Sequence, residues 1–125
     1  MPHPLTTLAL FDGDEILCVV GFFNYDKISV EGAIASDRPW GDRRFIRKVF
    51  HYVFNELGCR RFYVRVDASN TQAHEMDLRL GFRHEGTLRE AAQDGGDVHV
   101  LAMLKSEYLE SKWHGKESAK SAGNA

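Results

Sequence analysis

The longest uninterrupted apolar run in this chain spans only eight residues, from Ile16 to Phe23. A membrane-spanning helix needs about 20 such residues, so the sequence predicts no such helix. The run is apolar at both alternating positions, which indicates a central strand that is buried on both faces. Asp12-Gly13 before it and Asn24 to Lys27 after it have the composition of turns. The chain is therefore expected to fold around a sheet.

Hydrophobic periodicity outside this run predicts the remaining elements. Alternation predicts strands, and a spacing of three and four residues predicts helices. The expected strands cover residues 5–11, 28–35, 61–66, 84–92 and 97–105, and the expected helices cover about 42–57 and 71–80. A helix separates the third strand from the fourth, so we expect those two strands to be parallel or splayed neighbours. The fold class is therefore α+β, with a mixed, mostly antiparallel sheet and two main helices.

Size and composition indicate one globular domain. The chain has 125 residues, of which 43% are apolar and 27% are charged, and a chain of this kind forms a single core. We expect a domain over residues 1–113 and a disordered polar tail over residues 114–125. The N-terminus does not have the pattern of a signal peptide, and Cys18 and Cys59 are isolated, so we expect a cytoplasmic protein with reduced thiols. The six histidines show no metal-ligand spacing, and we expect no metal.

Positive charge is concentrated in the middle of the chain, although the net charge is −2. Residues 38–65 carry eight basic side chains and two acidic ones, which gives this stretch a charge of +6. Such a stretch suits a phosphate-bearing ligand, and the alternative is an ordinary solvated helix face. We expect no binding to nucleic acid, because the net charge is negative and no recognition motif is present.

The segment from Asn70 to Phe82, NTQAHEMDLRLGF, resembles the second-helix signature of the GNAT superfamily of N-acetyltransferases. With the Glu-Gly-x-x-Arg pattern of residues 85–89, it is similar to the branch that acetylates the N-terminal amines of ribosomal proteins. The similarity covers about residues 16–105, and short chains of this kind resemble proteins of tailed bacteriophages and prophages. The family places a strand and two helices before this region. We therefore expect a GNAT-like sheet that lacks the N-terminal strand and the first two helices.

The resemblance implies direct transfer of an acetyl group from acetyl-CoA to an amine. The acceptor would be a protein N-terminus, a lysine or a small amine. The alternative is a catalytically degenerate GNAT fold that serves as a protein-interaction module. Without the family's first two helices, a sheet face with Leu17, Val19 and Phe23 would be an uncovered apolar patch. Large apolar patches usually mark interfaces, so we expect a homodimer.

The family's pyrophosphate loop corresponds to residues 36–42 of this chain, where Pro39 removes one backbone donor. Arginine side chains beside a helix N-terminus can take over the binding of phosphate. Asn70 matches the family residue at the cofactor site and is also a good N-cap. The cofactor-binding residues implied in this way are Ala35, whose strand end supplies a backbone N–H for the oxyanion, Arg38, Trp40, Gly41, Asp42, Arg43, Arg44, Asn70 and Ala73.

Two carboxylates are the candidate catalytic residues. Glu31 is the candidate general base, because strand alternation places it opposite Val30 and Ile34, and the alternative is an ordinary exposed strand residue. Asp77 falls where the family usually has its general-acid tyrosine, and a desolvated aspartic acid can give a proton to a leaving thiolate. The weaker alternatives are Asp67 and His99 as the base, and Tyr63 and Tyr108 as the acid.

Overall fold

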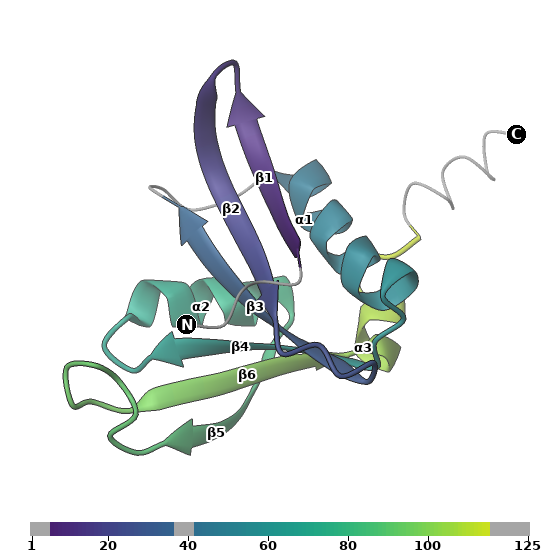
Figure 1. The fold of residues 1–125 in the computed structure, drawn as a ribbon. Coiled ribbons are helices and arrows are strands. Elements are labelled where there is room, and N and C mark those ends of the chain that lie inside the picture. The colour runs from purple at the N-terminus through teal and green to yellow at the C-terminus, as the bar shows by residue number, and fades with distance from the viewer. Residues whose placement is uncertain (1–5, 37–41, 116–125) are drawn as a thin grey trace, which may run out of the picture.

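The protein forms one six-stranded sheet with helices on one side (Figure 1). The computed structural model describes residues 6–36 and 42–115. Its strands, in chain order, are β1 (Thr6–Asp12), β2 (Glu15–Phe23), β3 (Ser29–Ser36), β4 (Arg61–Asp67), β5 (Arg83–Leu88) and β6 (Val98–Leu104). Its helices are α1 (Arg43–His51), α2 (Thr71–Leu80) and α3 (Lys105–Leu109), with a π-helical turn, η1 (Tyr52–Glu56), after α1.

The strand order across the sheet is β1-β2-β3-β4-β6-β5. Within the described residues, β3 and β4 are the one parallel pair, and every other neighbouring pair is antiparallel. The crossover through α1 makes this parallel pairing necessary, because the chain returns to the same end of the sheet before it enters β4. The predicted α+β class, the mixed sheet and the parallel neighbours are confirmed.

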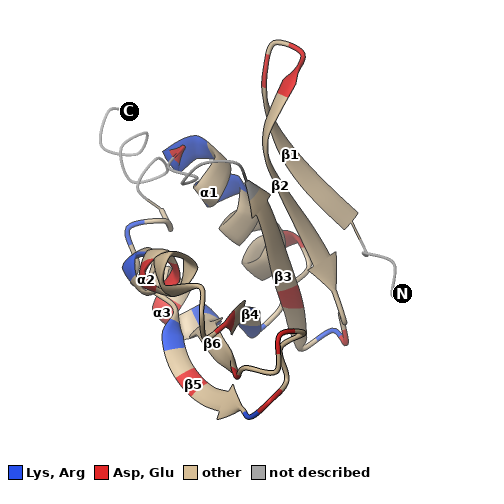
Figure 2. Ribbon diagram, turned by 90° about the vertical axis from the view of Figure 1, so that its left-hand side faces the viewer, with Lys and Arg blue, Asp and Glu red and all other residues tan. Residues whose placement is uncertain are grey.

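The core lies between the helices and one face of the sheet (Figure 2). Alternate residues of the inner strands point into it, and α1 and η1 contribute consecutive apolar turns. Fully buried members with large side chains are Phe22, Phe50, Phe54, Phe62, Leu101 and Met103. The opposite face of the sheet, called the open face below, carries Leu17, Val19 and Phe23, which are each half-buried.

The predicted single helix over 42–57 changes its winding part of the way along. α1 ends at His51, and the next turn is η1, in which the Leu57 N–H donates to the Tyr52 carbonyl oxygen at 2.8 Å. This bond skips one residue more than an α-helical bond. Val53 and Phe54 in this turn are fully buried and continue the apolar face of α1.

The predicted strand over 84–92 is too long at its C-terminal end. β5 ends at Leu88, because the chain turns away at Glu90, which has a φ of 55°. The Glu90 N–H donates to Asp97 Oδ1 at 2.9 Å, and the Ala92 N–H donates to the Gly96 carbonyl oxygen at 2.9 Å. These bonds form a compact loop in place of the last strand residues.

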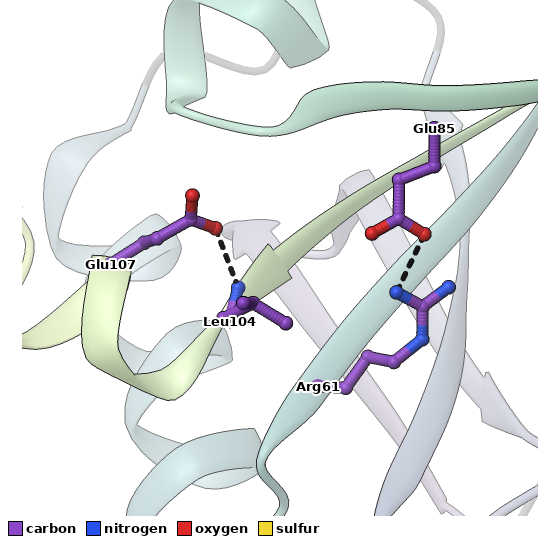
Figure 3. A network of polar contacts seen from close by, with 4 residues as sticks. All are labelled: Arg61, Glu85, Leu104 and Glu107. Atoms are coloured by element: carbon purple, nitrogen blue, oxygen red, sulfur yellow. Dashed lines mark hydrogen bonds and ion pairs between the residues drawn. The ribbon is translucent and has the colours of Figure 1, made fainter.

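The region after β6 closes the core with a short helix that sequence periodicity did not predict. α3 begins where Glu107 Oε1 accepts the Leu104 N–H at 2.9 Å (Figure 3). Tyr108 and Trp113 are buried, and Trp113 Nε1–H donates to the Leu80 carbonyl oxygen at 2.8 Å. Most of the predicted tail, residues 116–125, lies outside the described residues. In the part that the structure describes, no helix has the length and apolar content needed to cross a membrane.

Candidate active site

The two parallel strands separate part of the way along their length. β3 and β4 are paired from Ser29 with Arg61 to Gly32 with Val64, and the register ends there. Residues 33–36 of β3 remain paired with β2, and residues 65–67 of β4 remain paired with β6, so the sheet opens between them (Figure 1). We call this opening the strand divergence. Facing backbone N–H and C=O groups without a ladder partner are a template for another extended chain.

A glycine makes the close packing at the start of the strand divergence possible. A Cβ at Gly32 would lie 2.6 Å from Cε1 of the Phe62 ring. Such a distance is too short for two carbon atoms, so the Phe62 ring can occupy this place only because residue 32 has no side chain. The sequence did not identify Gly32 as a position where glycine is needed, because the side chain that needs the space, Phe62, lies 30 positions away in the chain.

The candidate base Glu31 lies on the open face at the base of the strand divergence. It is half-buried and is paired directly with Tyr63 of β4. Its Oε1 accepts a hydrogen bond from Asn24 Nδ2 at 2.9 Å. Burial, and secondarily the charge of Glu31, raises the pKa of Tyr63. The position of Glu31 therefore fits a group that contacts a substrate between the strands.

Asn24 was missed by the sequence analysis. It lies in the turn after β2 with a φ of 55°, a left-handed conformation that asparagine tolerates better than most residues. The turn composition around Asn24 was visible in the sequence. Its contact with Glu31, seven residues later, required the β2–β3 hairpin to form first.

The positive stretch over residues 38–65 does not form one patch. Arg61 lies on the open face, where its guanidinium is 5.4 Å from the Tyr63 ring centre. Its Nη1 is 2.6 Å from Glu85 Oε1 of β5, an ion pair that reaches across β6 (Figure 3). Arg43 and Arg44 lie instead in the first turn of α1, apart from the basic residues of β4 (Figure 2). The basic groups are therefore divided between different sides of the sheet.

The first turn of α1 carries three of the predicted cofactor ligands. Asp42 is the N-cap, and its Oδ1 accepts the Phe45 N–H at 3.0 Å. Arg43 and Arg44 follow directly and are exposed. The helix dipole and the two guanidinium groups favour an anion here, whereas the Asp42 carboxylate opposes one. The predicted ligands Arg38, Trp40 and Gly41 lie outside the described residues.

The first turn of α2 follows shortly after the end of β4, on one side of the strand divergence. Asn70 is its N-cap, since Asn70 Oδ1 accepts the Ala73 N–H at 3.1 Å. The Asn70 N–H donates to the Asp67 carbonyl oxygen at 2.8 Å, which turns the chain from strand into helix. Asn70 and Ala73 therefore lie together just after the end of β4, and Ala35 lies in the part of β3 that is paired with β2 but no longer with β4.

Asp77 is buried in the middle of α2. Its exposed fraction is 4%, and it is the one charged side chain that is buried in the described part of the chain. Burial raises the pKa of Asp77 from 3.8 to about 7. A carboxyl group in this state holds a proton near neutral pH and can release it, as a general acid must.

The alternative acids differ sharply in their surroundings. Tyr108 is fully enclosed in the core, where its ring stacks on Phe54 with centroids 4.7 Å apart. Burial raises the pKa of Tyr108 as well. Tyr63 is half-buried on the open face beside Glu31. Of the two alternative bases, Asp67 is exposed at the end of β4, and His99 faces α2 in a cluster of histidines described below.

Comparison with solved structures identifies the architecture. A chimera of the spermidine N-acetyltransferase SpeG from Vibrio cholerae with hSSAT superposes with a TM-score of 0.71 at 24% identity, covering 83% of this chain and 69% of that chain. Mutant forms of the spermidine/spermine N-acetyltransferase SpeG from Vibrio cholerae give a TM-score of 0.71 at 26% identity, covering 82% of this chain and 68% of that chain. The chain has the fold of these N-acetyltransferases. No protein-family model and no curated protein sequence matches it.

The N-acetyltransferase fold confirms the superfamily architecture that the second-helix signature implied. The strand divergence, Glu31 and the first turns of α1 and α2 are therefore parts of a fold shared with the spermidine N-acetyltransferase SpeG. Over residues 6–36 and 42–115, no group of three or more His, Cys, Asp or Glu side chains is arranged to hold a metal ion.

Proposed function

We propose that this protein is an N-acetyltransferase that uses acetyl-CoA as the acetyl donor and an amine as the acceptor. The observation that carries the proposal is the divergence of β3 from β4 within the shared fold. Acetyl-CoA has an extended arm with two amide groups, and such an arm can pair with a free strand edge. Its pyrophosphate would meet Arg43 and Arg44 at the N-terminus of α1.

The proposed reaction uses the two carboxylates on the two sides of the sheet. The amine nitrogen attacks the thioester carbon, a C–N bond forms, and the C–S bond breaks. Glu31 takes the proton that the amine loses, and Asp77 gives a proton to the departing thiolate. A backbone N–H near Ala35 stabilises the negative charge on the carbonyl oxygen. Asn70 and Ala73 would position the arm of the cofactor at the first turn of α2.

For the acceptor, we propose a small cationic amine in preference to a protein N-terminus or a lysine. Besides burial, the charges of Glu31 and Asp26 raise the pKa of Tyr63, so both carboxylates act on the same part of the sheet. Hydrogen bonds from the backbone of Ser29 and Ile28 lower the pKa of Asp26, which keeps it ionised. Negative groups attract cationic amines. The similar solved structures are of enzymes named for spermidine, whereas the resemblance to the ribosomal-protein branch favours a protein N-terminus.

The proposal is tested by incubating the protein with acetyl-CoA and three acceptors, namely spermidine, a lysine peptide and a peptide with a free N-terminus. Released thiol and the mass of the acetylated product are measured. We expect acetylation of spermidine, which disappears when Glu31 is replaced by Gln. If millimolar acetyl-CoA neither binds at low salt nor supports transfer, the alternative of an interaction module without catalysis takes its place.

We also propose that the protein forms a homodimer through the open face. Leu17, Val19 and Phe23 lie on this face, and the described helices cover the other one. A sedimentation experiment at high concentration tests this, and a monomer of 14.2 kDa would contradict it. The domain is proposed to extend through Trp113, whose ring lies 6.0 Å from that of Phe50 in the core.

A further inference from the structure

Three histidines from three different elements come together between α2 and the edge of the sheet. His74 belongs to α2, His84 to β5 and His99 to β6. Their ring centres are 5.7 Å apart for His74 and His84, 5.2 Å for His74 and His99, and 4.8 Å for His84 and His99. His84 is exposed and the other two are half-buried, so solvent reaches the cluster. The proposed acetyl transfer assigns no role to this group.

The distance between two of the ring nitrogens is unusual for a hydrogen bond. His74 Nε2 and His84 Nδ1 are 3.5 Å apart. A hydrogen bond donated by an N–H group normally brings the two heavy atoms to about 2.7–3.2 Å. Two imidazole nitrogens bound to one tetrahedral Zn²⁺, at about 2.0–2.1 Å each, lie about 3.4 Å apart. The observed separation is therefore closer to that of two ligands of one ion.

A hydroxyl group supports the orientation that His84 needs as a ligand. Thr87 Oγ1 lies 3.3 Å from His84 Nε2 and 3.0 Å from His99 Nδ1. If His84 Nδ1 binds an ion, its proton is on Nε2, and that N–H faces Thr87 Oγ1, 3.3 Å away, as its acceptor in the metal-bound form. The Thr87 hydroxyl then donates to His99 Nδ1. Metal-binding histidines usually donate their second N–H in this way, which fixes the tautomer and the ring.

We propose that His74 Nε2 and His84 Nδ1 bind a divalent transition-metal ion of the Zn²⁺ or Cu²⁺ type. Imidazole nitrogens suit these ions, and Cu²⁺ binds more tightly than Zn²⁺ in sites of this kind. The protein supplies two ligands, in keeping with the lack of a three-residue metal group in the described residues, and water fills the other positions. Thr87 and His99 are positioning residues. The ion joins the first turn of α2 to the β5–β6 edge.

This assignment could not come from the spacing of histidines along the chain. His74 and His84 are ten residues apart, and His99 is fifteen residues further on. β5 and β6 pair so that His84 lies opposite Leu101, and Thr87 lies opposite His99. The side chains of His84, Thr87 and His99 consequently point to the helix side of the sheet. α2 lies on that side and adds His74.

The test uses the full-length chain without a histidine tag, after treatment with EDTA. Zn²⁺ binding is measured by calorimetry, and the number of bound nitrogens is measured from the electron paramagnetic resonance spectrum of the Cu²⁺ form. We expect one ion per chain with two nitrogen ligands. His74→Ala and His84→Ala should each weaken Zn²⁺ binding by more than tenfold, and Thr87→Val should weaken it by about 10- to 100-fold. Binding should also weaken at acidic pH, because the ligand nitrogens must be unprotonated.

His51→Ala provides the matched control, because His51 is an exposed histidine on α1 that bonds to Asn55 and lies outside the cluster. This variant should bind Zn²⁺ as the unmodified protein does. Circular dichroism establishes that each variant is folded, and His84→Asn serves as a second, smaller change. The proposal is overturned if His74→Ala and His84→Ala bind as tightly as the unmodified protein. It is equally overturned if His51→Ala loses as much affinity, since the ion would then bind surface histidines in general.

Discussion

Replacing Asp77 by Asn should stabilise the protein, and the gain should depend on pH. Burial raises the pKa of Asp77 from 3.8 to about 7 in the folded chain, whereas the unfolded chain keeps the ordinary value. The difference of roughly three pKa units corresponds to about 4 kcal/mol, at about 1.4 kcal/mol per unit. Between these two pKa values the folded state holds a proton that the unfolded state has lost. Stability therefore falls as pH rises from about 4 to about 7, and it stays low above that.

The Asn side chain does not ionise, so Asp77→Asn removes this pH-dependent cost. The free energy of unfolding is measured by urea denaturation of both proteins from pH 5 to pH 8. We expect the advantage of the variant to grow by about 3 kcal/mol over this range. Other titrating groups are common to both proteins and cancel in the difference. Glu75→Gln, which changes an exposed carboxylate on the same helix, is the matched control. A stability difference for Asp77→Asn that does not vary with pH would refute the reasoning.

Three further outcomes follow from the site. Gly32→Ala should lower the free energy of unfolding by about 1–3 kcal/mol, because the new Cβ meets the Phe62 ring, and unchanged urea denaturation would contradict this contact. Replacing Arg43 and Arg44 together by Ala should weaken acetyl-CoA binding by about 10- to 100-fold, measured by calorimetry, and binding should then depend less on salt. Unchanged affinity would show that the N-terminus of α1 does not contact the cofactor. Glu31→Gln should lower kcat by about 10²- to 10⁴-fold with acetyl-CoA affinity kept, and a preserved rate would exclude Glu31 as the base.

Local sequence patterns determined most of the secondary structure. The apolar run over residues 16–23 became β2, an interior strand between β1 and β3, as predicted. The predicted burial on both faces is wrong, because the helices cover one face of the sheet, where Cys18, Val20 and Phe22 are buried, while Leu17, Val19 and Phe23 on the open face are half-buried. Asn70 and Gly81 marked the ends of α2 correctly, since an N-cap and a left-handed C-cap are local requirements of the backbone. The helix between β3 and β4 was sufficient to predict parallel or splayed neighbours, and the two strands pair in parallel as far as Gly32 with Val64 before they diverge.

Tertiary structure decided the features that give the candidate site its chemistry. The amino acid at position 77 was visible in the sequence, but its proton affinity near neutral pH arises from burial, which depends on how α2 packs on the sheet. The basic residues over 38–65 form one stretch in sequence, yet β4 carries Arg61 to the open face, where Glu85 neutralises it. The three histidines meet only through the pairing of β5 with β6 and the placement of α2. Local patterns set backbone conformation, whereas charge, proton affinity and ligand geometry depend on neighbours that are distant in the chain.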